Sequence, residues 1–213
     1  MRFRTTTPVT AFLLLLTFAL AGCSSTSTGE KMVQSYEKTS DMLTGSQQQV
    51  DATLMILSRL RNTPAPGLKD TFAQYKQAVA QLEKDAKDAA WRAQSMKEES
   101  DAHIQQWQSE MASIKDPEIK STLASRREAA RSNFKLIMMY ADDVRGAYKP
   151  FLEDNQSIMK ALSIDLSPTA VASLSSSIER VQSGGEQLKV RLGLMRRAMD
   201  NIVNGISPLG QLE

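Results

Sequence analysis

Apolar residues recur alternately at every third and fourth position over three long stretches of the sequence. The repeat runs over residues 72–107, 123–162 and 171–202, and a weaker version, interrupted by polar residues, runs over 33–57. A spacing that averages 3.5 residues places apolar side chains along one side of an α-helix and is typical of helices that pack in coiled coils. The repeat therefore restricts the chain to a fold built from long packed helices.

These repeats predict four long helices, at residues 29–62, 69–115, 117–163 and 168–204. No stretch shows the β-branched alternation that is typical of a strand. Since the connections are short, consecutive helices are expected to be antiparallel. At a rise of 1.5 Å per residue, the second and third helices would each be about 70 Å long. The expected fold is all-α, an elongated antiparallel helical bundle or coiled coil of four long helices.

Prolines mark two of the expected helix starts. Asp116 and Ser167 each precede a proline, which puts a capping side chain directly before the first helical position. Pro150 lies inside the third predicted helix, where the missing N–H predicts a kink.

The first 22 residues are typical of an export signal. Arg2 and Arg4 precede an apolar run over 8–21, which is shorter than the about 20 residues that a membrane-spanning helix needs. The run ends in LAGC, which resembles the lipobox of bacterial lipoproteins. The resemblance implies cleavage between Gly22 and Cys23 and attachment of a diacylglyceryl group to the cysteine sulfur.

Cys23 is the only cysteine, so lipidation would leave no thiol for a disulfide or a metal. Lipoproteins normally carry a further acyl chain, such as palmitate, on the new N-terminus, and two or more chains hold a protein stably on a membrane. In Gram-negative lipoproteins an aspartate after the cysteine usually retains the protein in the inner membrane. Ser24 therefore predicts lipid anchoring in the outer membrane, on its periplasmic face.

The predicted organisation has four parts. The signal peptide occupies residues 1–22, the lipidated N-terminus and linker 23–29, the helical rod domain 30–205 and the C-terminal tail 206–213. Two of the 26 basic residues lie in the signal, so 24 basic residues then face 24 acidic ones. This balance argues against a nucleic-acid partner, which needs a net basic field.

The sequence lacks the set of residues that a catalytic or metal-binding site needs. His103 is the only histidine, so neither a paired Glu-x-x-His di-iron site nor a catalytic triad around another histidine can be assembled. We expect His103 to lie in a helix seam. The chain is therefore expected to be no enzyme, with no metal and no cofactor beyond the covalent lipid on Cys23.

Antiparallel pairing predicts that the hairpin of the second and third helices extends beyond both other helices over 104–128, at the same end as Cys23. This tip is expected to contact lipid headgroups or a partner, unless the C-terminal tail or a second copy of the chain covers it. The candidate contact residues are Trp107, Met111, Ile114, Lys115, Ile119 and Lys120.

The same register places the acidic run 98–101 opposite Arg131 and Lys135, and we expect salt bridges between the two helices there.

Two segments, SYEKTSDMLTGSQQQVDATLMILSRL at 35–60 and IERVQSGGEQLKVRL at 178–192, together with the lipobox, carry a family resemblance. The chain resembles an uncharacterised family of proteobacterial helical lipoproteins, known only as a domain of unknown function. The resemblance implies a single helical domain and a location in the cell envelope, and it transfers no binding or catalytic residue.

The expected function is that of a non-enzymatic outer-membrane lipoprotein, acting as a periplasmic coiled-coil scaffold or interaction module through a protein partner or self-association. The alternative is a periplasmic carrier or chaperone-like protein that binds an apolar ligand or client. In that case Ala86, Ala89, Ala93 and Gly185 would line the groove.

Overall fold

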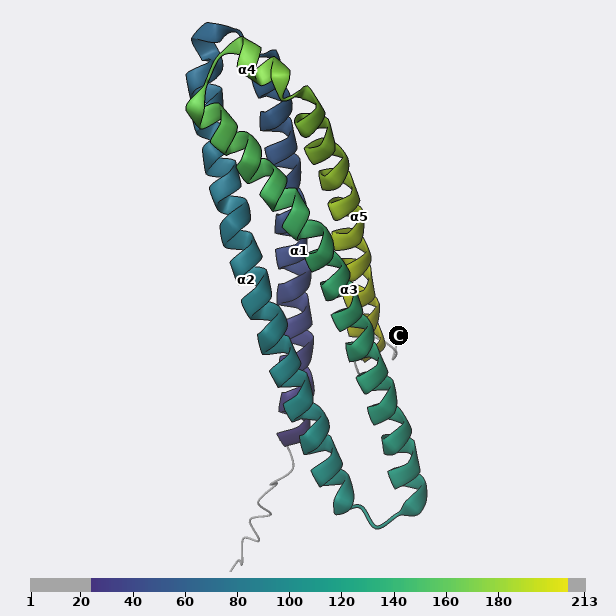
Figure 1. The fold of residues 1–213 in the computed structure, drawn as a ribbon. Helices are drawn as coiled ribbons and strands as arrows, with labels where there is room; N and C mark the ends of the chain where they lie inside the picture. The colour runs from purple at the N-terminus through teal and green to yellow at the C-terminus, as the bar shows by residue number, and fades with distance from the viewer. Residues whose placement is uncertain (1–23, 207–213) are drawn as a thin grey trace, which may run out of the picture.

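The computed structural model describes residues 24–206, and within this range it describes side chains over 31–204. Four long helices and a short one make up this part of the chain, and it contains no strand (Figure 1). They are α1 (Ser24–Asn62), α2 (Ala65–Ala112), α3 (Pro117–Ile164), α4 (Pro168–Ser173) and α5 (Ser175–Ile206). The expected all-α fold with antiparallel long helices is confirmed.

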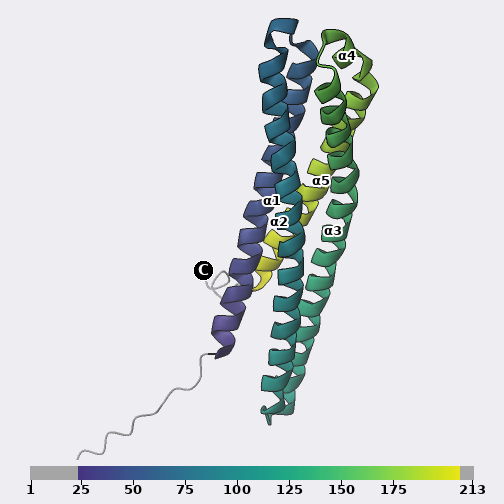
Figure 2. The same cartoon turned by 60° about the vertical axis from the view of Figure 1, so that its left-hand side comes forward.

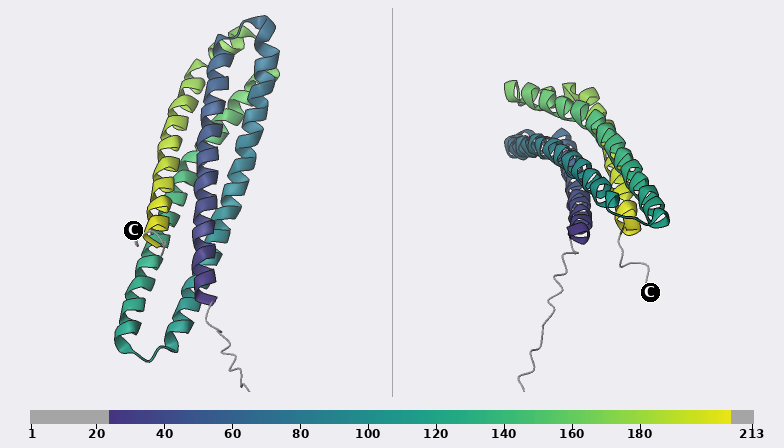
Figure 3. Two further views of the ribbon diagram at one scale, coloured as in Figure 1. Left: turned by 180° about the vertical axis from the view of Figure 1, so that it is seen from behind. Right: turned by 90° about the horizontal axis from the view of Figure 1, so that it is seen from below.

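The long helices form a ring of neighbours. α1 packs against α2 and α5, and α3 packs against the same two helices. The α1–α2 turn and α4 lie together at one end of the rod, which we call the closed end (Figures 1 and 2). The α2–α3 turn lies at the opposite end, beyond the start of α1 and further beyond the end of α5 (Figures 1 and 3). The expected overhang of the α2–α3 hairpin is therefore present.

The helix bounds differ most from the sequence prediction at three points. α1 begins at Ser24 rather than at residue 29, so residues 24–28 belong to the helix. α2 begins at Ala65, four residues earlier than predicted. The predicted fourth helix is divided at Leu174, whose backbone N–H bonds to the carbonyls of Val171 and Ala172. The short α4 lets the chain turn across the closed end before α5 starts.

Both predicted capping residues act as expected. Asp116 accepts hydrogen bonds from the backbone N–H groups of Glu118 and Ile119, at 2.9 and 3.1 Å. Ser167 Oγ accepts from the N–H of Ala170 at 3.1 Å. α3 continues through Pro150 to Ile164, as the uninterrupted repeat predicted, and the kink at Pro150 stays a prediction.

The closed end has a continuous core with a polar pair at its centre. Tyr75 and Asn155 are fully buried, and the Tyr75 hydroxyl donates to Asn155 Oδ1 at 2.9 Å and to its carbonyl at 3.2 Å. Asn155 in turn donates to the carbonyl of Phe151 at 2.8 Å. Large side chains without measurable exposure surround this pair, among them Leu57, Leu60, Val79, Leu82, Ile178 and Leu188. All of these except Leu60 occupy predicted seam positions.

Gly185 marks the closest approach of helices in this core. A Cβ built there would lie 2.8 Å from Leu54 Cδ1 and 3.0 Å from Phe151 Cε2. The glycine therefore allows α1 and α3 to pack directly against the backbone of α5, which runs through this position as a continuous helix.

Candidate functional site

The end of the rod opposite α4 is built differently, and we call it the open end. It comprises residues 97–140 of the α2–α3 hairpin and residues 190–206 of α5. α5 ends first, α1 starts somewhat further along, and only the α2–α3 hairpin extends past both, so the apolar face of α3 extends past the last turn of α5 (Figure 1). Side chains that would be covered in a four-helix cross-section are here open to solvent.

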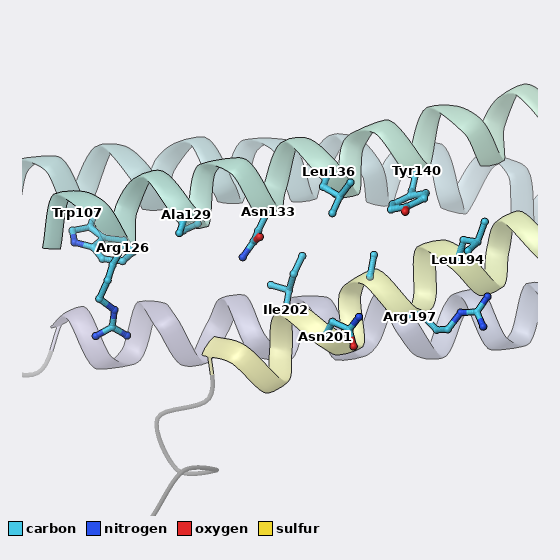
Figure 4. Close-up of a pocket in the computed structure, with 12 residues that line it drawn as sticks. Trp107, Arg126, Ala129, Asn133, Leu136, Tyr140, Leu194, Arg197, Asn201 and Ile202 are labelled. Carbon is cyan, nitrogen blue, oxygen red and sulfur yellow. The ribbon is translucent and has the colours of Figure 1, made fainter. Parts of the chain in front are cut away.

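An apolar groove of about 610 Å³ occupies this junction (Figure 4). Leu136 of α3 and Leu194 of α5 line it from opposite sides, and each keeps about two fifths of its surface exposed, 39% and 40%. Besides these leucines, the groove is lined by Trp107, Ala129, Ala130, Asn133, Tyr140, Ala198, Asn201 and Ile202.

Two arginines flank the apolar groove. Arg126 lies beside Trp107 at one end, and Arg197 lies near Leu194 on the α5 side (Figure 4). Neither guanidinium forms an ion pair or hydrogen bond with another residue of the described part of the chain. The groove thus combines an apolar floor with two cations available to an outside group.

The predicted tip residues fall into different environments. Met111 is buried in the seam between α2 and α3, with 6% of its surface exposed. Trp107 and Ile114 are half-buried, and the Trp107 ring lines the groove. Ile119 is exposed over 52% of its surface, and Lys115 and Lys120 are also exposed. The structure brings Trp107 to the groove and leaves the lysines near the turn.

The salt bridges predicted between α2 and α3 are absent among the described residues. Asp101 pairs with Lys97 at 2.9 Å, and Glu98 accepts a hydrogen bond from Gln94 at 2.6 Å, both within α2. Arg131 lies 3.9 Å from Glu128 of its own helix. The prediction was wrong because Glu98 and Asp101 pair within α2 and Glu99 faces Ser35 of α1 instead of α3.

Glu99 and Arg92 form the contact between α1 and α2 near the start of α1. Arg92 donates to Thr39 Oγ1 at 3.0 Å and to the carbonyl of Ser35 at 2.7 Å, and lies 3.5 Å from Glu99. Burial raises the pKa of the Glu99 carboxyl, but hydrogen bonds from Ser35 and Ser95, together with Arg92, outweigh it and hold the pKa below its ordinary value. Glu99 is therefore ionised at neutral pH.

His103 is half-buried and lines a hollow between α1 and α2, with its ring centroid 5.6 Å from that of Trp107. Its Nδ1 is buried and has no hydrogen-bond partner among the described residues. Burial lowers the pKa of His103. Residues 24–206 contain no group of three or more histidine, cysteine or acidic side chains that could hold a metal ion.

The residues of the predicted anchor are not placed. Gly22 and Cys23 lie outside the described residues, and Ser24 is the first residue of α1, with its side chain outside them as well. Within the described helices, none is both long and apolar enough to cross a membrane.

The small residues considered for a carrier do not form one groove. Gly185 is enclosed by Leu54 and Phe151, whereas Ala89 is exposed on α2, and Ala86 and Ala93 are half-buried. The groove instead depends on Leu136 and Leu194, which sequence reasoning missed. A signal was present, because each directly precedes a seam residue and adds an apolar side chain outside the repeat.

The fold and groove define the class of this protein as an elongated antiparallel helical bundle with one four-helix end and one two-helix end. A family model described as a protein of unknown function, DUF2959, matches residues 25–204, and the chain belongs to this family. No match was found among curated proteins or among solved structures.

Proposed function

We propose that this chain is a non-enzymatic lipoprotein of the bacterial outer membrane, held on the periplasmic face by lipid on Cys23. In this proposal it acts as a helical scaffold that binds a partner protein through the apolar groove. The observation that carries the proposal is the open groove itself, an apolar floor between two arginines without partners in the described chain.

The chemistry of the groove favours a helical partner segment with acidic flanks. Leucine and aromatic side chains in a trough are typical of sites that accept the apolar face of an amphipathic helix. Carboxylates beside that face would pair with Arg126 and Arg197, and guanidinium–carboxylate pairs fix orientation as well as adding affinity. The closed end is instead filled by fully buried aliphatic side chains, which supports its role as the rigid part of the scaffold.

The partner proposal is tested by photo-cross-linking in intact cells. A photoreactive amino acid at Leu194 of the full chain is expected to give a protein adduct of defined mass. The charge reversal R126E/R197E should abolish it, whereas K69E/K160E at the closed end should leave it intact. Met55, which is 62% exposed on α1, is the matched control position and should give no such adduct.

Other adducts would point to other occupants. A product of twice the chain's mass would mean that a second copy fills the groove, and a lipid adduct would favour the carrier alternative. The absence of any adduct at Leu194, or an adduct that persists in R126E/R197E, would contradict the proposed partner.

The anchor is tested separately by metabolic labelling with an alkyne-bearing palmitate. The wild-type chain should incorporate label and fractionate with the outer membrane, and Cys23→Ala should lose both properties. Ser24→Asp should keep the label and move the chain to the inner membrane. Incorporation that survives Cys23→Ala would refute the anchor.

A further inference from the structure

A second hollow, of about 400 Å³, lies between residues 31–38 of α1 and the second half of α2. Unlike the apolar groove, it is lined mainly by charged and polar side chains: Lys31, Ser35 and Lys38 from α1, and Arg92, Glu99 and His103 from α2. We propose that this polar pocket binds a phosphate-bearing anion, with Lys31 and Lys38 as its principal counter-charges.

The inner wall of the pocket is rigid and electrically balanced. The Arg92 side chain keeps only 12% of its surface exposed and is held by Ser35, Thr39 and Glu99. Its positive charge is matched by Glu99, which also accepts a hydrogen bond from Ser35 at 2.5 Å. The pair therefore shapes the pocket without contributing net charge to it.

Lys31 and Lys38 remain uncompensated at the rim. They are seven residues apart, two helical turns, so both project from the same side of α1, with about 10 Å between them along the axis. Neither forms an ion pair with a described residue, although Asp41 follows Lys38 by one turn. Two ammonium groups on flexible stems can close on one phosphate from either side, each as a point charge with three donors.

His103 supplies an independent reason to expect an oxygen atom in this pocket. Its buried Nδ1 has no hydrogen-bond partner among the described residues, and such a group normally binds a ligand or an ordered water. The His103 side chain lines the pocket, and a neutral imidazole protonated on Nδ1 can donate to an oxygen of the bound anion. Phosphate, with several acceptor oxygens and a double negative charge, satisfies the lysines and the imidazole together.

The phosphate is either free or part of a lipid headgroup. Calorimetric titration of the full chain in a non-ionic detergent distinguishes these two sources. The probes are inorganic phosphate and monomeric dihexanoyl phosphatidylglycerol. Binding of both means that the phosphate alone suffices, and binding of the lipid alone assigns the pocket to headgroups. The proposal is overturned when neither probe binds.

Matched variants locate the site. K31Q/K38Q should raise the Kd at least tenfold, whereas K69Q/K160Q, the same change of charge at the closed end, should alter it less than twofold. His103→Phe, which keeps an aromatic ring beside Trp107, should weaken binding severalfold, and Glu99→Gln should strengthen it because it removes the nearby negative charge. If K31Q/K38Q and K69Q/K160Q weakened binding equally, the effect would come from the overall charge of the chain, and the proposed site would be overturned.

This inference does not depend on the apolar groove or the lipid on Cys23. Failure of the Leu194 cross-link or of the palmitate label leaves the titration result standing, and failure of the titration leaves those two results standing.

Discussion

The two ends of the rod share one heptad repeat but differ in the number of helices around it. At the closed end four helices and α4 enclose Tyr75, Asn155 and aliphatic side chains with no measurable exposure. At the open end α5 and α1 both stop short of the α2–α3 turn, and Leu136 and Leu194 stay two-fifths exposed. The repeat therefore decides which face of each helix is apolar, and the helix lengths decide whether that face is covered.

The largest expected effect is a difference in the free energy of unfolding when one buried isoleucine at each end is replaced by alanine. Ile158→Ala, at a position 1% exposed, should lower the free energy of unfolding by about 3–4 kcal/mol, because a cavity opens in a core enclosed on all sides. Ile104→Ala, at 8% exposure in the open-end part of α2, should cost about 1–2 kcal/mol because its surroundings can collapse or hydrate. Urea unfolding of the chain from Ser24 onward measures both values, and equal losses would contradict the difference between the ends.

The next effect compares two tyrosine hydroxyls. Tyr75→Phe removes the hydroxyl that donates to Asn155 and leaves the buried carbonyl and Oδ1 of Asn155 without this donor. The free energy of unfolding should fall by about 1–3 kcal/mol. Tyr140, on the groove, has no hydrogen-bond partner among the described residues. Tyr140→Phe should change stability by less than about 0.5 kcal/mol. Thermal unfolding followed by circular dichroism is the measurement, and a Tyr140→Phe loss as large as that of Tyr75→Phe would refute the comparison.

Glycine substitutions sharpen the contrast between enclosed and open helix faces. Gly146→Ala meets no atom within 4 Å and should stabilise the chain by up to about 1 kcal/mol through helix propensity. Gly185→Ala gains the same propensity but forces Leu54 and Phe151 to shift, so we expect a net loss of about 1 kcal/mol. Denaturant midpoints for the pair should move in opposite directions, and a stabilising Gly185→Ala would show that the closed end is loosely packed.

The smallest effect is a pH dependence at the open end. Because hydrogen bonds and Arg92 hold the pKa of Glu99 below its ordinary value of 4.5, ionised Glu99 stabilises the fold above that pH. This stabilisation is lost as the pH falls through the lowered pKa. With 45% of the side chain exposed, it should amount to less than about 1 kcal/mol. In Glu99→Gln the free energy of unfolding should fall less steeply as the pH is lowered below about 4.5. An unchanged acid dependence would contradict the stabilising role of ionised Glu99.

The sequence alone predicted much of the closed end. Large aliphatic side chains at consecutive seam positions, such as Ile158 and Leu162, identified both the helix and its buried face, and the proline turns located its ends. The break at Leu174 carried no sequence signal that we recognised, since the apolar spacing continues across it from Val171 to Ile178.

The open end was harder to predict for a physical reason. A repeat specifies that a face is apolar, but it does not specify which neighbour covers it, so Glu98 and Asp101 were predicted to pair with α3 although they pair within α2. The groove arises because α5 ends at Ile206 while α3 continues along the hairpin, which is a property of relative lengths. The sequence did contain one indication that the hairpin is not enclosed, because polar residues such as His103 and Arg127 occupy seam positions there.

Hydrogen exchange of the full chain, followed by mass spectrometry, tests most directly whether the closed end is rigidly packed while the open end opens locally. Amides over 68–82 and 148–162 should exchange only through global unfolding, because four helices surround them. Amides over 104–130 should exchange through local opening, at least a hundredfold faster and with little dependence on the stability of the closed end. Uniform protection along α2 and α3 would contradict the account.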